Sequence, residues 1–143
     1  ITLFEALDKI YKKYGYHNEL QVSINLKGEA GLKMIKKIMD TIRDTNGKFT
    51  DEIPAVYTDI LTGDIISYNT DGSIASKQSC NLPSSNVLYF EYKDKWFCVR
   101  PSGTEPKIKI YFGGKSNSLD SAHDKAIKLK EEVVGKIMPI IKK

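Results

Sequence analysis

The sequence predicts an α+β fold in which two helices cover one face of an antiparallel sheet of about 4-5 strands. Three observations carry this prediction. Apolar residues recur with helical spacing in two long segments, residues 28–47 and 119–137. Several short segments alternate apolar and polar residues, as half-buried strands do. The predicted order is strand, helix, roughly four strands and helix, which suits a sheet layer packed against a helical layer.

The start of the chain predicts a short helix over residues 2–14. Thr2 and Glu5 have the spacing of a capping box, and Gly15 is a plausible end. Apolar residues with helical spacing follow at Leu3, Leu7, Ile10 and Tyr14. Because the chain begins at Ile1 without methionine and enters directly into this pattern, we expect it to be a piece of a longer protein.

The middle of the chain predicts one strand, one helix and a hairpin. Residues 20–26 alternate as a half-buried strand. The helix over 28–47 has its apolar stripe at Leu32, Ile35, Ile38 or Met39, and Ile42. Residues 55–61 and 65–68 predict a hairpin or a bent strand. Residues 69–79 are rich in Asn, Asp, Gly and Ser, and we expect them to form an exposed loop with little order.

The last third predicts a hairpin, a further strand and a long helix. Residues 87–92 and 96–100 flank a short turn, and residues 107–113 alternate as the last strand. Ser118 is expected to cap the final helix, and Pro139 is expected to end or kink it. The apolar stripe of this helix comprises Leu119, Ala122, Ala126, Leu129, Val133 and Ile137.

Composition limits the classes of protein to consider. A chain of 143 residues normally forms one domain with its own core. The 22 basic and 18 acidic residues leave a net charge of +4, which favours anionic ligands only mildly. No apolar run approaches the roughly 20 residues that cross a bilayer, and no signal-peptide pattern is present, so we expect a cytoplasmic protein. We expect Cys80 and Cys98 to be free thiols, with Cys98 in the core of a strand.

A loop beginning at Arg100 has the residues best suited to bind a phosphate. Arg100 offers a planar fork of N–H donors that matches two phosphate oxygens, and the hydroxyls of Ser102 and Thr104 can each donate one more hydrogen bond. Gly103 lets the backbone turn tightly and present its N–H groups to an anion. The alternative is that these residues merely serve turn chemistry, but the whole run favours a phosphate cradle.

The strand after this loop extends the predicted site. Lys107, Lys109 and Tyr111 share one face of the alternating run, so Lys109 could add a second positive charge. Glu105 would repel a phosphate, and we expect it to contact a sugar hydroxyl or to orient Arg100. The predicted phosphate-binding residues are Arg100, Ser102, Gly103, Thr104 and Lys109.

The same stretch resembles a known family. The run Arg100-Pro-Ser-Gly-Thr-Glu-Pro106, followed by Lys107-Ile-Lys-Ile-Tyr111, is similar to the phosphate-binding loop in the C-terminal domain of phosphoglucomutases, within the α-D-phosphohexomutase family. The resemblance continues upstream of the loop, where the sequence looks like the phosphoglucomutase and phosphopentomutase branch of the family. The matching residues are Leu82-Pro83-x-Ser85-Asn86-Val87-Leu88-x-Phe90, followed by Trp96. The resemblance implies a TATA-box-binding-protein-like domain over residues 20–143, preceded at residues 1–19 by the tail helix and linker of a third domain.

The resemblance also implies the function of the parent enzyme. That enzyme would be a magnesium-dependent isomerase that interconverts hexose 1-phosphate and 6-phosphate through a phosphoserine and a sugar bisphosphate. The phosphoserine loop, the metal loop and the sugar-binding loop of the family have no counterpart in this sequence. We therefore expect this chain to anchor the distal phosphate, with the other domains and the phosphosugar as partners. By itself it should have no catalytic residue, no metal or cofactor and no mutase activity.

Two alternatives for the whole protein stay open. The same family includes phosphomannomutases and phosphopentomutases, and glucose, mannose and pentose phosphates share the anchored group. A stand-alone phosphate-binding module is the other possibility. The sequence does not set the preferred sugar or the oligomeric state.

Other candidate sites have simpler interpretations. Ser102 as a nucleophile would need a nearby base, and His17 and His123 are both expected on the surface. Residues 28–31 are expected at a helix start, and residues 70–73 are expected in a turn rather than in a metal loop. Three lysine pairs lie on separate segments, which favours solvated helix faces over a nucleic-acid site; they are Lys12–Lys13, Lys36–Lys37 and Lys142–Lys143.

Overall fold

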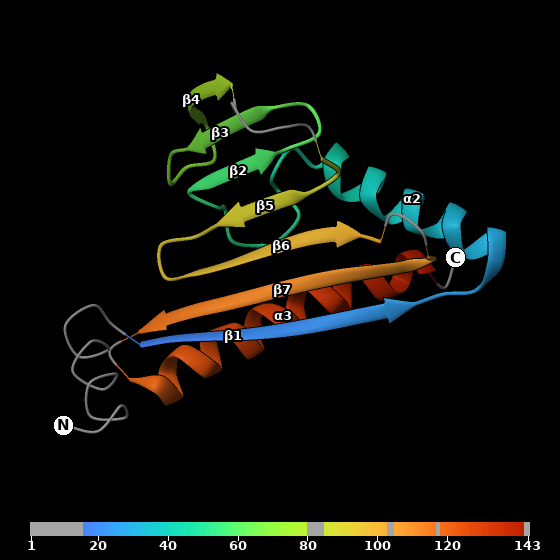
Figure 1. Cartoon of the computed structure of the whole chain (residues 1–143). Helices are drawn as coiled ribbons and strands as arrows, with labels where there is room; N and C mark the ends of the chain where they lie inside the picture. Colours follow the sequence, from blue (N-terminus) through green and yellow to red (C-terminus); the bar gives the residue numbers. More distant parts are fainter. Residues whose placement is uncertain (1–15, 80–84, 103–104, 117, 142–143) are drawn as a thin grey trace.

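The computed structural model describes residues 16–79, 85–102, 105–116 and 118–141. The helix expected over residues 2–14 therefore lies outside the described residues. The described chain forms a sheet backed by two helices, α2 and α3 (Figure 1). In chain order the elements are β1 (Tyr16–Asn25), α2 (Gly28–Asp44), β2 (Val56–Asp59), β3 (Asp64–Tyr68), β4 (Ile74–Ser79), β5 (Leu88–Glu91), β6 (Lys95–Pro101), β7 (Lys107–Ser116) and α3 (Leu119–Ile141).

The sheet is antiparallel throughout, with the spatial order β1-β7-β6-β5-β2-β3-β4. β7 is the last strand in the chain, yet it lies between β1 and β6 and pairs along its whole length with β1. The predicted fold class is confirmed, and the described sheet has seven strands instead of four or five.

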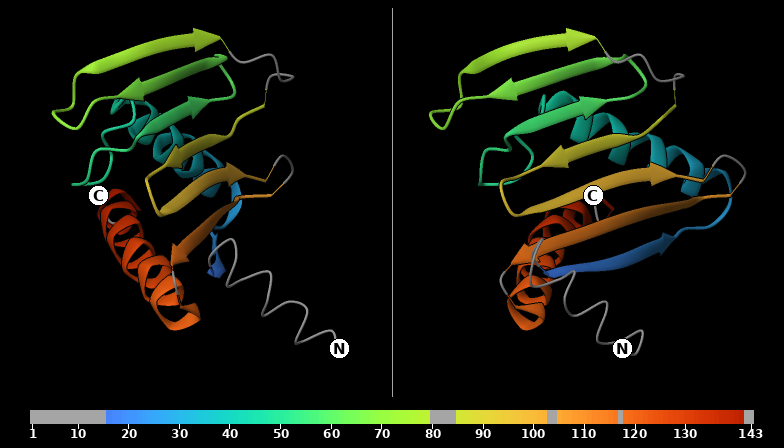
Figure 2. Two further views of the ribbon diagram at one scale, coloured as in Figure 1. Left: turned by 90° about the vertical axis from the view of Figure 1, so that its left-hand side faces the viewer. Right: turned by 60° about the vertical axis from the view of Figure 1, so that its left-hand side comes forward.

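Both helices lie against the same face of the sheet, as the side view in Figure 2 shows. Side chains along a strand alternate between the two faces of the sheet, and the residues of β6 and β7 that face the helices are Phe, Val and Ile. The sheet therefore meets the helices with apolar side chains. A hydrophobic core joins both helices to the sheet, and its fully buried members include Ile38, Ile42, Phe90, Phe97, Val99, Ile108, Ile110, Phe112, Val133 and Ile137. The opposite face, here called the open face, has no described helix over it.

The stripe predicted for α2 is correct at all but one position. Ile35, Ile38, Met39 and Ile42 are buried, but Leu32 is 49% exposed. The first turn of α2 instead turns Gly31 inward, where it packs against residues of the loop before β7. The stripe predicted for α3 is confirmed from Ala122 to Ile137.

Two segment predictions need correction. Residues 74–79 form the edge strand β4, although the sequence predicted a loop of little order, because pairing with β3 supplies backbone hydrogen bonds that side-chain pattern does not reveal. All six residues of β4 are exposed, so no apolar alternation marked the strand. β1 begins at Tyr16 rather than at Leu20, and residues 16–19, expected to be a linker, pair with β7.

Of the smaller predictions, some are confirmed and others need correction. Residues 69–73 form a turn, as predicted, in which Ser73 donates from its backbone N–H and from its hydroxyl to Asp71. α3 continues through Pro139, which was expected to end or kink it, and ends at Ile141. Cys98 is not a core residue: it is half-buried and lies on the open face, because its neighbours Phe97 and Val99 face the helices. No described helix is long and apolar enough to span a membrane.

Candidate functional site

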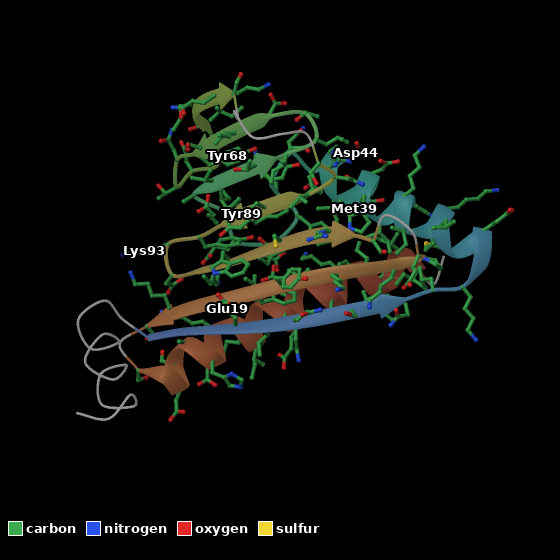
Figure 3. All side chains as sticks on the ribbon, viewed as in Figure 1. Glu19, Met39, Asp44, Tyr68, Tyr89 and Lys93 are labelled. Atoms are coloured by element: carbon green, nitrogen blue, oxygen red, sulfur yellow. The ribbon has the colours of Figure 1, made fainter. Side chains whose placement is uncertain are left out.

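β6 and β7 bring the predicted cationic residues together at one end of the open face. Arg100 near the end of β6 is paired in register with Lys109 of β7. Cross-strand partners have Cβ atoms about 5 Å apart, so these two side chains are direct neighbours. Burial alternates along β7, with Ile108 and Ile110 at 0% exposure, which places Lys107 and Lys109 on the open face. In Figure 3, Tyr89 of β5 marks the open face and Met39 of α2 marks the covered side.

The loop between β6 and β7 is closed by short-range hydrogen bonds. The backbone N–H of Ser102 donates to the carbonyl oxygen of Lys107 at 2.8 Å, and the N–H of Lys107 donates to the carbonyl of Glu105 at 2.8 Å. The Ser102 hydroxyl accepts a long hydrogen bond of 3.4 Å from the N–H of Glu105, which is the pattern of a serine-stabilised turn. Two of the predicted site residues, Gly103 and Thr104, lie outside the described residues.

β1 and α2 support the far side of the loop. The N–H of Leu26, between β1 and α2, donates to the carbonyl of Pro106 at 2.7 Å. A Cβ atom added to Gly31 would lie 2.9 Å from the Cβ of Pro106 and 3.0 Å from that of Leu26. Glycine is therefore needed at position 31 for the first turn of α2 to approach the loop this closely.

Arg100, Lys107 and Lys109 form what we call the basic cluster. None of the three makes a salt bridge with a described residue, whereas Arg43, Lys77, Lys95, Lys125 and Lys136 each do. Arg100 is exposed, and the two lysines are half-buried. Three neighbouring cations without a carboxylate partner among the described residues favour an anion from solution, and the arginine fork fits a phosphate or carboxylate group. Glu105 of the loop is exposed and has no salt bridge with any described residue.

The described geometry argues against nucleophilic chemistry at this end of the sheet. Burial raises the pKa of the Cys98 thiol, although the Tyr111 backbone and the Arg100 guanidinium oppose this rise, so the thiol stays protonated at neutral pH. Ser102 lies at the Lys107 end of β7. His123 follows Ala122, whose carbonyl packs on Gly114 near the other end of β7, so this histidine cannot serve Ser102 as a base.

The other arginine of the chain, Arg43, has a structural role that the sequence analysis missed. Its Nε donates to Asp59 Oδ2 at 2.8 Å, and its Nη2 donates to Asn86 Oδ1 at 2.7 Å. Asp59 is only 3% exposed and also accepts a hydrogen bond of 3.0 Å from the N–H of Leu61. This network joins the last turn of α2 to the end of β2 and to the residues before β5. The sequence offers one hint of this network, which is the position of Asp59 at the end of an alternating strand.

A hollow of about 580 Å³ lies at the opposite end of β6 from the basic cluster, lined by residues 51–55, 68–70 and 92–94. Its three carboxylates are all in ion pairs: Asp94 pairs with Lys125 at 2.6 Å, Asp51 with Lys136 at 3.1 Å and Glu52 with Lys95 at 3.3 Å. In the described part of the chain, no group of three or more His, Cys, Asp or Glu residues could hold a metal ion. The hollow therefore offers no chemistry comparable with that of the basic cluster.

The chain is similar to a known protein family and to several known proteins. A family model described as "Phosphoglucomutase/phosphomannomutase, C-terminal domain" matches residues 24–130, which include the basic cluster and most of the sheet. A phosphoglucomutase of Staphylococcus aureus (strain bovine RF122 / ET3-1) is 32% identical over 125 residues, covering 87% of this chain and 22% of that protein. One from Staphylococcus aureus strain MSSA476 is 33% identical with the same coverage. A phosphoglucomutase of Staphylococcus saprophyticus is 29% identical over 129 residues, covering 84% of this chain and 21% of that protein.

These relatives confirm the resemblance that was based on the loop at residues 100–106 and on the strand after it. The chain spans about a fifth of the length of the curated relatives it matches.

Proposed function

Because the chain belongs to the family of phosphoglucomutase and phosphomannomutase C-terminal domains, we propose that it binds the phosphate group of a phosphosugar at the basic cluster. One observation carries the proposal: Arg100, Lys107 and Lys109 adjoin one another on the open face without a salt bridge to any described residue. The loop residues Ser102, Gly103 and Thr104 would complete the anion site with hydroxyl and backbone donors.

The proposed role is to position the substrate. In a parent enzyme that moves a phosphoryl group between the two ends of a hexose, the reacting end changes while the other phosphate needs a fixed anchor. The arginine fork and the lysine ammonium groups would supply binding energy and orientation, which lower the barrier by holding the reacting groups in place. The domain would not be catalytic alone.

The phosphoserine and the magnesium ion implied for the parent enzyme would belong to other domains. The described residues contain no cluster suited to a divalent cation, so no step is assigned to a metal in this chain. Since the basic cluster would recognise the phosphate, the same anchor suits glucose, mannose and pentose phosphates.

An amide NMR titration of the purified chain tests the location of the site. We expect weak binding of glucose 6-phosphate and of inorganic phosphate, in the millimolar range or poorer, because one open loop that holds one phosphate contributes about 4 kcal/mol or less. The largest chemical-shift changes should fall on residues 100–109. Changes centred on the hollow at residues 51–55 and 92–94 would show that the phosphate site is wrongly placed.

A further inference from the structure

The open face continues from the basic cluster onto the edge strand β1. Asn25 is paired in register with Lys107, and Ser23 is paired with Lys109. Since Lys109 is also the partner of Arg100, three adjacent strands place Ser23, Lys109 and Arg100 in one row across the sheet. Both β1 side chains are exposed, because the alternate residues Val22 and Ile24 pack against the core.

This end of β1 is held against the loop between β6 and β7. Leu26, which follows Asn25, donates its N–H to the carbonyl of Pro106 at 2.7 Å. Asn25 is therefore the β1 residue closest along the strand to the loop. Ser23 lies about 7 Å further along the strand and Gln21 about 13 Å further, at roughly 3.3 Å per residue.

The chemistry of these side chains differs from that of the basic cluster. The carboxamide of Asn25 has two N–H donors and one acceptor oxygen, and the Ser23 hydroxyl both donates and accepts. Sugar hydroxyl groups are donors and acceptors too, so they match neutral side chains, whereas a phosphate matches the cations. Among the described residues, neither side chain has a hydrogen-bond partner.

We propose that Asn25 and Ser23 bind hydroxyl groups of the sugar whose phosphate lies at the basic cluster. β1 then contributes to selection of a phosphosugar over inorganic phosphate. This inference rests on the proposed function, because the phosphate delivers the sugar to β1.

Dissociation constants for glucose 6-phosphate and for inorganic phosphate, measured by amide NMR on four variants, test the proposal. Asn25→Ala should weaken binding of glucose 6-phosphate by about 3- to 10-fold and Ser23→Ala by about 2- to 5-fold, as expected for one or two lost hydrogen bonds. Both variants should bind inorganic phosphate as the unchanged chain does. Gln21→Ala is the matched control on the same face of β1 and should change neither constant. Arg100→Ala should weaken both ligands.

The outcomes separate this inference from the proposed function. If Asn25→Ala and Ser23→Ala leave glucose 6-phosphate binding unchanged while Arg100→Ala weakens both ligands, the phosphate anchor stands and the β1 sugar contact is wrong. Equal weakening of both ligands by the β1 variants also overturns the sugar contact. If the unchanged chain binds glucose 6-phosphate no more tightly than phosphate, the sugar makes no favourable contact at all. If Arg100→Ala affects neither ligand, the proposed function itself fails.

Discussion

The chain has two arginines, and the structure uses them in opposite ways. Arg43 is at the end of α2, where it donates to a buried carboxylate, Asp59, and to the amide oxygen of Asn86. Arg100 is exposed at the end of β6, beside Lys109 and Lys107, and makes no salt bridge with a described residue. One guanidinium thus compensates a charge inside the protein, and the other has no acidic partner among the described residues.

The difference shows that residue type alone does not decide the role of a cation. A charge on a buried group must be compensated within the fold, so the network of Arg43 is a requirement for stability. An exposed cation keeps its hydration and costs little to leave unpaired. Arg100, which is exposed, can therefore stay without a salt bridge at little cost in folding free energy.

The largest expected effect on folding separates the two arginines. Arg43→Ala should lower the free energy of unfolding by about 3 kcal/mol, because it leaves the Asp59 carboxylate buried without its cationic partner. Arg100→Ala should change the same quantity by less than about 0.5 kcal/mol. Urea unfolding of both variants measures the contrast. A similar loss in the two variants would mean that Arg100 is structural as well.

A smaller effect is expected where α2 meets the loop between β6 and β7. Gly31→Ala should lower the free energy of unfolding by about 1 kcal/mol, since the clash of the new methyl with Pro106 outweighs the better helix propensity of alanine. Gly135→Ala is the matched control, because nothing lies within 4 Å of the added Cβ, and it should stabilise the chain by about 0.5 kcal/mol. Stabilisation by both alanines would contradict the close packing of α2 on the loop.

The smallest effect concerns a surface ion pair that contrasts with the buried pair of Arg43. Lys125 donates a hydrogen bond to Asp94 at 2.6 Å. This hydrogen bond and the charge of Lys125 lower the pKa of Asp94, and they outweigh partial burial, which raises it. A carboxyl with a lowered folded-state pKa stabilises the fold above its unfolded pKa and loses that contribution as pH falls through the folded value.

The free energies of unfolding of Asp94→Asn and of the unchanged chain, measured between pH 7 and about pH 2, test whether this contribution to stability is lost in acid. The stability difference should be about 0.5 kcal/mol or less at neutral pH, because Asp94 is 42% exposed, and it should vanish in acid. A difference that grows as pH falls would contradict the assignment.

Much of the fold follows from local sequence pattern. The alternation in β7 and the stripe of α3 were sufficient to predict which face each of these elements buries, and the run from Arg100 to Tyr111 was sufficient to recognise the family. These features depend on the period of strands and helices and on a short contiguous motif, all of which can be observed in one sequence.

The features that the sequence did not predict depend on contacts between segments and not on the pattern within one segment. β4 has six exposed residues and is a strand only because β3 pairs with it. The contact of Asp59 with Arg43 spans 16 residues, and that of Asn86 with Arg43 spans 43, so neither pairing has a local signal. For the same reason, the position of Ser23 and Asn25 beside the basic cluster could be inferred only from the register of β1 with β7.

The most direct test of the proposed anion site compares two variants that lose the same charge. Arg100→Ala removes a member of the basic cluster, and Lys36→Ala removes an exposed cation from α2. We predict that the dissociation constant for inorganic phosphate rises about tenfold for Arg100→Ala, as expected for loss of hydrogen bonds between charged groups, and stays unchanged for Lys36→Ala. An equal change in both variants would mean that phosphate responds only to net charge, and the anion site at Arg100 would be disproved.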